Sequence, residues 1–296
     1  MRSMLGAASL AACAAVAACA PAPDESGVVT LVYATPYSPG HPFSRADRRW
    51  IDFVEEASGG SLVIRPSWSG ALLSSEHSLV ELRHGVVDVG LITPIYVKGG
   101  AHLIRIQSGF YGGVETIEEQ VALYRCLAAG HPQFERELEG LVVLAVQGGN
   151  LPGVVTRDRP VRRLEDLEGM RIRVPTELLS VMRDLGADPV TMPMSDVYSA
   201  LAKGVIDGVA IPWEVTLPLK ISELVDTHTA FSGRHGLYTA TFIFAMNRES
   251  YERLPADLKK VIDDNSGPEV AALFGKAMDE VDVIGRGVAE KAGDSL

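Results

Sequence analysis

Strand-like and helix-like segments alternate along this chain from residue 28 onward, and this alternation constrains its fold more than any other feature. Residues 28–34, 61–66 and 87–93 have the pattern of strands, and residues 41–57 and 74–84 have the apolar spacing of helices. Repeated strand–helix–strand steps are typical of parallel strands joined by right-handed crossovers. The sequence therefore predicts an α/β fold.

A cluster of glycine, asparagine and proline at residues 148–153 separates two such sets of elements. The first set ends with predicted helices at 116–129 and 131–138 and a strand at 141–147. The second set contains predicted strands and helices at 154–156, 170–174, 177–184, 189–192, 195–203 and 208–211. An apolar strand at 237–246 is then expected to cross back to the first set.

These breaks predict two lobes with a hinge near residue 150 and residues 230–240. We expect the first lobe to contain residues 28–150 and about 236–255. The second lobe should contain residues 151–235 and part of a long C-terminal helix. That helix is predicted over 256–296, with an interruption at Ser266-Gly267-Pro268.

The N-terminal residues have the pattern of an export signal. An apolar run follows Arg2 within residues 1–18, and it is too short to span a bilayer, which takes about 20 residues. Small residues precede Cys19, as in bacterial lipoprotein signals, so Cys19 is the predicted lipidation site and 19–27 a linker. Cys13 fits the same pattern with a shorter apolar run, and an ordinary cleavable signal is the alternative. Every alternative predicts export to the periplasm.

Charge and cysteine content exclude several classes of function. The formal net charge of −11 argues against nucleic acid or anionic lipid as a partner. Cys126 is alone in the chain after the signal, which excludes an internal disulfide and a paired-cysteine zinc site. Cys126 lies in an apolar helical stretch, so we expect it to be buried. No metal and no cofactor are expected.

The segment 169–175 carries the strongest signal for a binding site. Ile172 and Val174 alternate with Arg171 and Arg173, as in a half-buried strand, and Pro175 ends the strand. Ligands of open α/β sheets bind beyond the carboxyl ends of strands. Arg173 is therefore placed to meet a small anion, whereas Arg171 lies further back and is expected to be a surface charge.

Motifs in a fixed order extend this signal over nearly all of residues 28–290. They are LEDLEGMRIRVP at 164–175, LGADPV at 185–190, SDVYSAL at 195–201, GVIDG at 204–208, MN at 246–247 and YERLP at 251–255. This ordered set resembles the solute-binding subunits of tripartite ATP-independent periplasmic (TRAP) transporters.

The resemblance implies a two-lobed clamp of the periplasmic-binding-protein (type II-like) class, with hinge-crossing strands and a long C-terminal helix. Such a clamp closes on a small organic acid and delivers it to a membrane permease. The resemblance also implies that Arg173 is the carboxylate-binding arginine. A guanidinium group offers a planar fork that matches a carboxylate with two hydrogen bonds.

Further ligand contacts follow from the resemblance in the second lobe. Ile211 stands where some members have an asparagine, so a polar contact is missing there. Trp213 offers a flat surface for an aromatic or branched ligand, with hinge packing as the alternative. Met194 is a pocket wall or a core residue, and Glu214 is a candidate for a cation that binds with the ligand.

The opposite lobe and the crossing strand contribute the remaining candidates. Thr93 and Tyr96 follow the third strand and are placed to line the cleft, and Tyr238 and Thr241 lie near the crossing strand. His41 begins a helix on the expected cleft side, where it is either a neutral donor to the ligand or a surface residue. From Ile211 and Trp213, the expected ligand is a monocarboxylate, such as a keto or aromatic acid.

Two alternatives to transport are an exported α/β enzyme acting on a small acid and a ligand-sensing protein with the same clamp. The chain has no G-x-S-x-G elbow, phosphate-binding P-loop or H-E-x-x-H motif, which favours binding over catalysis. The family usually continues beyond the long C-terminal helix. If that element is absent, apolar helix surface is expected to be exposed.

Overall fold

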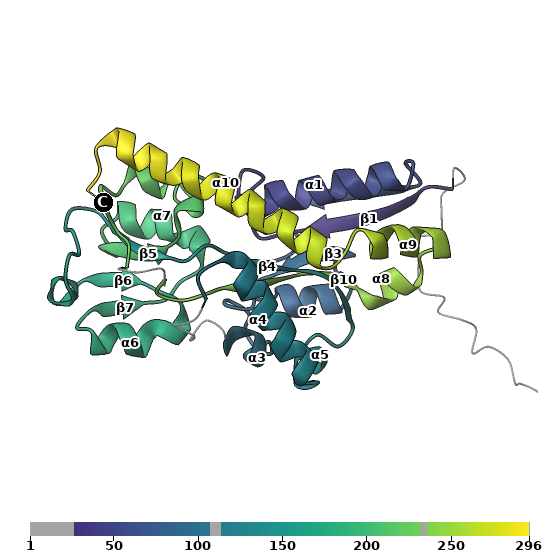
Figure 1. Cartoon of the computed structure of the whole chain (residues 1–296), viewed down its shortest axis with the longest axis horizontal. Coiled ribbons are helices and arrows are strands. Elements are labelled where there is room, and N and C mark those ends of the chain that lie inside the picture. The colour runs from purple at the N-terminus through teal and green to yellow at the C-terminus, as the bar shows by residue number, and fades with distance from the viewer. Residues whose placement is uncertain (1–26, 107–113, 232–235, 296) are drawn as a thin grey trace, which may run out of the picture.

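The computed structural model describes residues 27–106, 114–231 and 236–295. The predicted signal 1–18 and the predicted lipidation site Cys19 lie outside the described residues. Within the described chain, two five-stranded sheets lie side by side, and one long helix runs across both (Figure 1). The chain is an α/β protein, as predicted.

The first sheet has the strand order β2 (Leu62–Ser67), β1 (Val29–Ala34), β3 (Val89–Ile92), β10 (Thr241–Asn247) and β4 (Leu141–Gly148). β1 is parallel to β2 and β3, whereas β10 is antiparallel to both of its neighbours. The chain leaves this sheet after Gly148 and returns at Thr241, directly opposite. The chain thus leaves and re-enters the sheet at the same end of two neighbouring strands. For this reason β10 is antiparallel to β4, and the expectation of parallel strands fails at β10.

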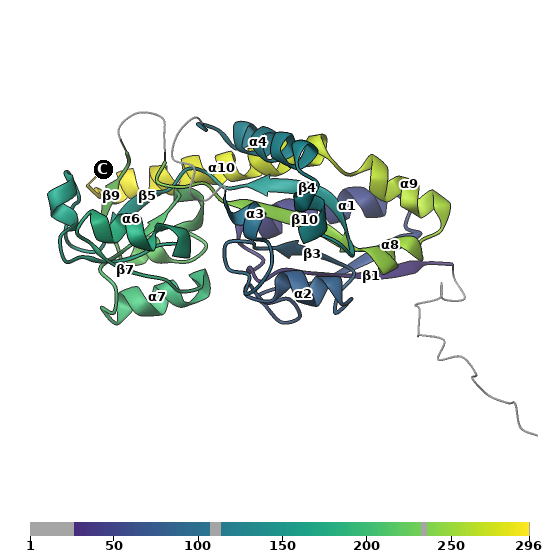
Figure 2. The same ribbon diagram turned by 90° about the horizontal axis from the view of Figure 1, so that it is seen from below.

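Helices cover both faces of this sheet. α1 (Pro42–Ala57) and α10 (Pro268–Ala292) lie on one face and α2 (Ser78–Arg83) on the other (Figures 1 and 2). Trp50 of α1 is fully buried, donates from Nε1 to the Asn265 carbonyl at 2.7 Å, and packs edge-on against Phe244 of β10. This one side chain joins α1, β10 and the C-terminal helices. The lobe is completed by α3 (His102–Arg105), α4 (Ile117–Gly130) and α5 (Gln133–Glu137).

The second sheet has the order β7 (Asp188–Val190), β6 (Arg171–Arg173), β8 (Gly208–Ile211), β5 (Gly153–Thr156) and β9 (Thr227–Thr229). β6 is parallel to β7 and β8, and β5 is antiparallel to β8 and β9. The surrounding helical segments are η2 (Leu164–Leu167), η3 (Thr176–Leu178), α6 (Leu179–Asp184), α7 (Met194–Ala202), η4 (Trp213–Val215) and η5 (Ile221–Glu223).

Three helices end the chain: α8 (Arg248–Glu252), α9 (Ala256–Asp264) and α10. Gly267 separates α9 from α10 with a φ of 86°, and Pro268 then begins α10 at a position where its missing N–H costs nothing. α10 contacts β4 and α1 of the first lobe and η4 of the second. Its last turns expose Val283, Ile284 and Val288. In the described part of the chain, no helix is long and apolar enough to cross a membrane.

Cys126 is exposed on α4, so the prediction that it is buried was wrong. The buried positions of α4 are Ile117, Gln120, Val121 and Tyr124, which follow the helical repeat. Cys126 falls outside that stripe. The stretch at 121–127 is apolar except for Arg125, and it concealed the phase of the helix.

Candidate functional site

Arg173 is buried at the carboxyl end of β6. Its Nε and Nη2 donate to the Met192 carbonyl at 3.0 and 2.8 Å, and Nη2 also donates to Tyr96 Oη at 3.0 Å. These bonds fix the plane of the guanidinium. Among the described residues, Nη1 is buried and has no hydrogen-bond partner. One arm of the fork therefore remains able to donate.

Tyrosine hydroxyls from the first lobe and the crossing segment surround this guanidinium. Burial alone would lower the pKa of Arg173, but nearby Tyr96 and Tyr238 raise it above its usual value. Burial raises the pKa of Tyr238, and that of Tyr37 rises well above its usual range for the same reason. The site thus presents one permanent cation and neutral hydroxyls. Its net positive charge suits an anionic ligand.

A cavity of about 50 Å³ lies between the lobes beside this cluster. Six aromatic side chains line it: Tyr37, His41, Phe43, Tyr96, Tyr238 and Phe242. The other apolar residues of the wall include Ile95, Met194, Ile211, Val215 and Leu219, and the polar side chains at the wall include Asn150 and Glu214. Tyr37 stacks on His41 at a centroid distance of 4.2 Å, and Phe43 packs on Phe242 at 4.5 Å. The rings support one another and form a preformed apolar enclosure.

His41 is held as a neutral donor. Its Nδ1 accepts from the Phe43 N–H at 3.2 Å and so caps α1, which leaves the ring proton on Nε2. Burial lowers the pKa of His41 to about 3. A neutral imidazole at the cavity wall can donate one hydrogen bond without adding charge.

Glu214 is buried where the cavity meets the hinge. Its Oε1 accepts from the Asn150 N–H at 3.1 Å. Burial, with the neighbouring Asp282 of α10, raises the pKa of Glu214 well above its usual value. A protonated carboxyl group has little affinity for a cation. No cluster of three or more metal-ligating side chains occurs within residues 27–106, 114–231 and 236–295.

Three residues predicted as ligand contacts make other contacts in this structure. Trp213 stacks on His228 at 4.3 Å, with ring planes 16° apart, in the arrangement of the hinge-packing alternative. Thr93, the residue after β3, is buried; its hydroxyl donates to the Ser75 carbonyl at 2.7 Å and its N–H to Ser78 Oγ at the start of α2. Thr241 is buried at the first position of β10, opposite Gly148. None of these three is among the described residues that line the cavity.

Arg171 forms a two-pronged ion pair with Asp207, in which Nη2 lies 2.6 Å from Oδ1 and Nε 3.1 Å from Oδ2. The sequence did not predict that Asp207 pairs with Arg171. It also did not predict that Tyr37, Phe43 and Phe242 line the cavity. Tyr37 comes three residues after the end of β1, so the rule that places ligands beyond strand ends would have found it. The two phenylalanines carried no separate signal, because apolar residues in a helix and a strand predict a core equally well.

Two lobes that enclose a buried arginine and an apolar cavity define a solute-binding clamp. The sequence matches the family described as bacterial extracellular solute-binding protein, family 7, over residues 33–280, and the chain belongs to that family. A TRAP solute-binding protein from Rhodoferax ferrireducens, crystallised with copurified benzoate, is 31% identical; the match covers 90% of this chain and 84% of that one, with a TM-score of 0.83. As a member of the family, this protein binds a small organic acid outside the cytoplasm and works with a TRAP membrane permease.

Two further structures are similar. A marine metagenome TRAP protein specific for aromatic acids, in complex with metahydroxyphenylacetate, is 32% identical over 90% of this chain and 84% of that one, with a TM-score of 0.82. A Bordetella bronchiseptica protein with bound mandelate is 25% identical over the same shares, with a TM-score of 0.81.

Proposed function

We propose that this protein captures an aromatic monocarboxylate. The observation that carries the proposal is the combination of one buried arginine, Arg173, with a cavity walled by six aromatic side chains. A single cation offers one carboxylate a partner, and the apolar walls would leave a second carboxylate unpaired at a large desolvation cost. The benzoate, metahydroxyphenylacetate and mandelate bound by the similar structures support this ligand class.

In this proposal, the ligand carboxylate receives hydrogen bonds from Arg173 and the Tyr96 hydroxyl. Tyr238 lines the same cavity, and its hydroxyl donates to the Ala210 carbonyl at 3.3 Å. The ring of the ligand packs between the aromatic wall and Met194 and Ile211. Ile211 supplies apolar surface where some members of the family place an amide, which favours a ring over a polar chain.

We further propose that closure is a movement of residues 28–150 and 236–255 against residues 151–235. The ligand favours the closed state because its carboxylate contacts groups from both lobes. Arg173 belongs to the second lobe, whereas its partner Tyr96 follows β3 of the first.

The site proposal is tested by calorimetry with benzoate. Arg173→Ala should weaken binding by about 30- to 1000-fold, because the carboxylate loses its charged partner in a buried site. Arg173→Lys should weaken it less, since charge remains but the fork is lost. Arg171→Ala is the matched control and should bind normally, because Arg171 pairs with Asp207.

Unchanged affinity in Arg173→Ala would refute the assignment. Succinate should leave the melting temperature of the wild type unchanged where benzoate raises it. Chromatography after incubation should recover benzoate intact, and its conversion to a product would instead favour the enzyme alternative.

We also propose that Cys19 carries the lipid that anchors this protein to the membrane near its permease. Expression in a bacterium fed labelled palmitate should label the wild type and place it in the membrane fraction. Cys19→Ala should lose both label and membrane association. Soluble, unlabelled wild-type protein would support ordinary signal cleavage.

A further inference from the structure

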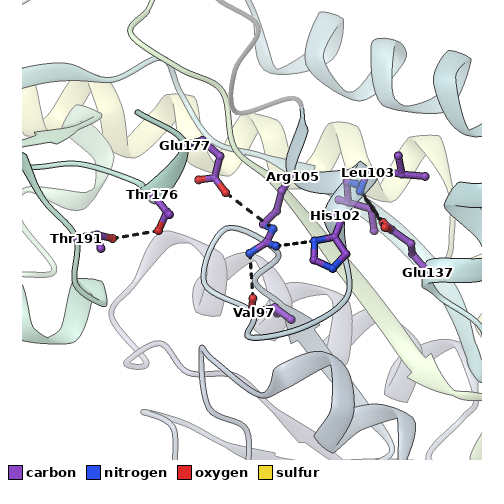
Figure 3. A network of polar contacts seen from close by, with 9 residues as sticks. Val97, His102, Leu103, Arg105, Glu137, Thr176, Glu177 and Thr191 are labelled. Carbon is purple, nitrogen blue, oxygen red and sulfur yellow. Dashed lines mark hydrogen bonds and ion pairs between the residues drawn. The ribbon is translucent and has the colours of Figure 1, made fainter. Parts of the chain in front are cut away.

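A second polar contact joins the lobes outside the ligand cavity. Arg105 of α3 and Glu177 of η3 approach each other from different lobes, with 3.9 Å between Nε and Oε1 (Figure 3). Their side chains are 21% and 23% exposed. The pair is therefore shielded enough from water for its attraction to exceed that of an open surface pair.

The first lobe holds Arg105 in position for this contact. Its Nη1 donates to the Val97 carbonyl at 3.1 Å, and its Nη2 donates to His102 Nδ1 at 3.0 Å. The start of α3 is tied to α5, because the Glu137 carboxylate accepts from the Leu103 N–H at 2.9 Å (Figure 3). The guanidinium is thus preorganised on its own lobe, and little side-chain entropy remains to be lost when Glu177 arrives.

Glu177 lies on the same short segment as the ligand-binding arginine. Only three residues separate it from Arg173. Thr176 Oγ1, beside Glu177, lies 3.4 Å from Thr191 Oγ1. Thr191 precedes Met192, whose carbonyl holds the Arg173 guanidinium in place. In the described chain, Glu177 Oε2 is buried and has no hydrogen-bond donor. A carboxylate in this state needs a nearby cation, and Arg105 meets that need from across the lobe boundary.

We propose that Arg105 and Glu177 form a latch that exists only when the lobes are closed and that slows the release of bound ligand. The proposal rests on the proposed function of Arg173 and deepens it. Opening the lobes must separate the pair, so its attraction stabilises the closed state alone. Neither residue is among the described residues that line the cavity, so the latch should act equally on every ligand that permits closure.

The experiment measures dissociation of benzoate by stopped flow. Glu177→Gln keeps the shape of the side chain and removes its charge. It should raise the dissociation rate constant about three- to tenfold and leave the association rate constant nearly unchanged. High salt should narrow the difference between the variant and the wild type.

Glu76→Gln is the matched control. Glu76 Oε2 lies 2.6 Å from Lys98 Nζ, but both residues belong to the first lobe. The rate of benzoate release should therefore be unaffected. Arg105→Gln and the variant that combines it with Glu177→Gln complete a double-mutant cycle. The combined variant should release ligand no faster than the faster of the two single variants. Melting temperatures without ligand check that each variant is folded.

If Glu177→Gln leaves the dissociation rate constant unchanged, the latch is overturned. It is also overturned if the increase in the combined variant equals the product of the increases in Glu177→Gln and Arg105→Gln. If the wild type does not bind benzoate, the proposed ligand class fails instead. The same kinetic comparison is then made with the organic acid that most raises the wild-type melting temperature, so the latch is judged separately.

Discussion

Asp47 is a fully buried carboxyl group in the first lobe, on the face of α1 that meets the sheet. It accepts hydrogen bonds from Tyr33 Oη and from Gln147 Nε2, the latter at 2.8 Å. Burial nevertheless raises the pKa of Asp47 to about 7. Because this pKa is higher than in the unfolded chain, the folded state holds the proton more tightly, and this group's contribution to stability falls as pH rises from about 4 to 7.

His41 has the opposite effect. Its pKa of about 3 lies below the unfolded value near 6.5, so its contribution to stability is lost as pH falls from about 6.5 toward 3. Between about pH 4 and 6.5 the two slopes oppose each other. The wild type should therefore show little net change from this pair of groups.

Asp47→Asn removes the contribution of Asp47 to the pH dependence of stability and leaves that of His41. The stability of the wild type relative to this variant should fall by about 3 kcal/mol between pH 4 and 7, because only the wild type releases the Asp47 proton. Urea denaturation at several pH values measures the difference. Curves that stay parallel over this range would show that Asp47 titrates normally.

At the scale of elements, α10 matters because it contacts both lobes. It approaches η4 so closely that a Cβ at Gly285 would lie 2.5 Å from the Trp213 carbonyl oxygen. Gly287, one half-turn further along the same helix, has nothing within 4 Å of the equivalent position. The two glycines have the same helical setting and differ in the space around them.

Alanine at these positions should therefore have opposite effects. Gly287→Ala should raise the free energy of unfolding by up to about 1 kcal/mol, because alanine favours a helix over glycine. Gly285→Ala should lower it by about 1–3 kcal/mol, because α10 must move away from η4. Chemical denaturation compares the two. Equal stabilisation by both substitutions would mean that α10 and η4 are not in close contact.

Most elements were predictable from local pattern, whereas the start of the crossing strand depends on pairing with a strand far away in the chain. The alternating residues at β6 and the amphipathic repeat of α1 depend on neighbours a few positions away. The strand predicted at 237–246 begins only at Thr241, where pairing with β4 begins. Apolar residues alone could not locate that start, because Leu237 and Tyr238 are buried without being part of a strand.

At the scale of the whole molecule, the site is shared between the lobes. Arg173 comes from the second lobe and the aromatic wall comes largely from the first and from the crossing strand. Figure 2 shows the two lobes joined by crossing segments, with α10 extending over both. In the proposed closure, one movement assembles the proposed ligand contacts and the Arg105–Glu177 pair together.

The sequence by itself determined the class of this protein, its α/β fold and the position of Arg173 at the end of a strand, since these follow from local periodicity and ordered motifs. Only the tertiary structure decided which aromatic side chains wall the cavity, that Trp213 stacks on His228, and which charges meet across the lobes. Those contacts join residues far apart in the chain. Their side-chain chemistry fits a core, a hinge or a ligand equally well until packing brings them together.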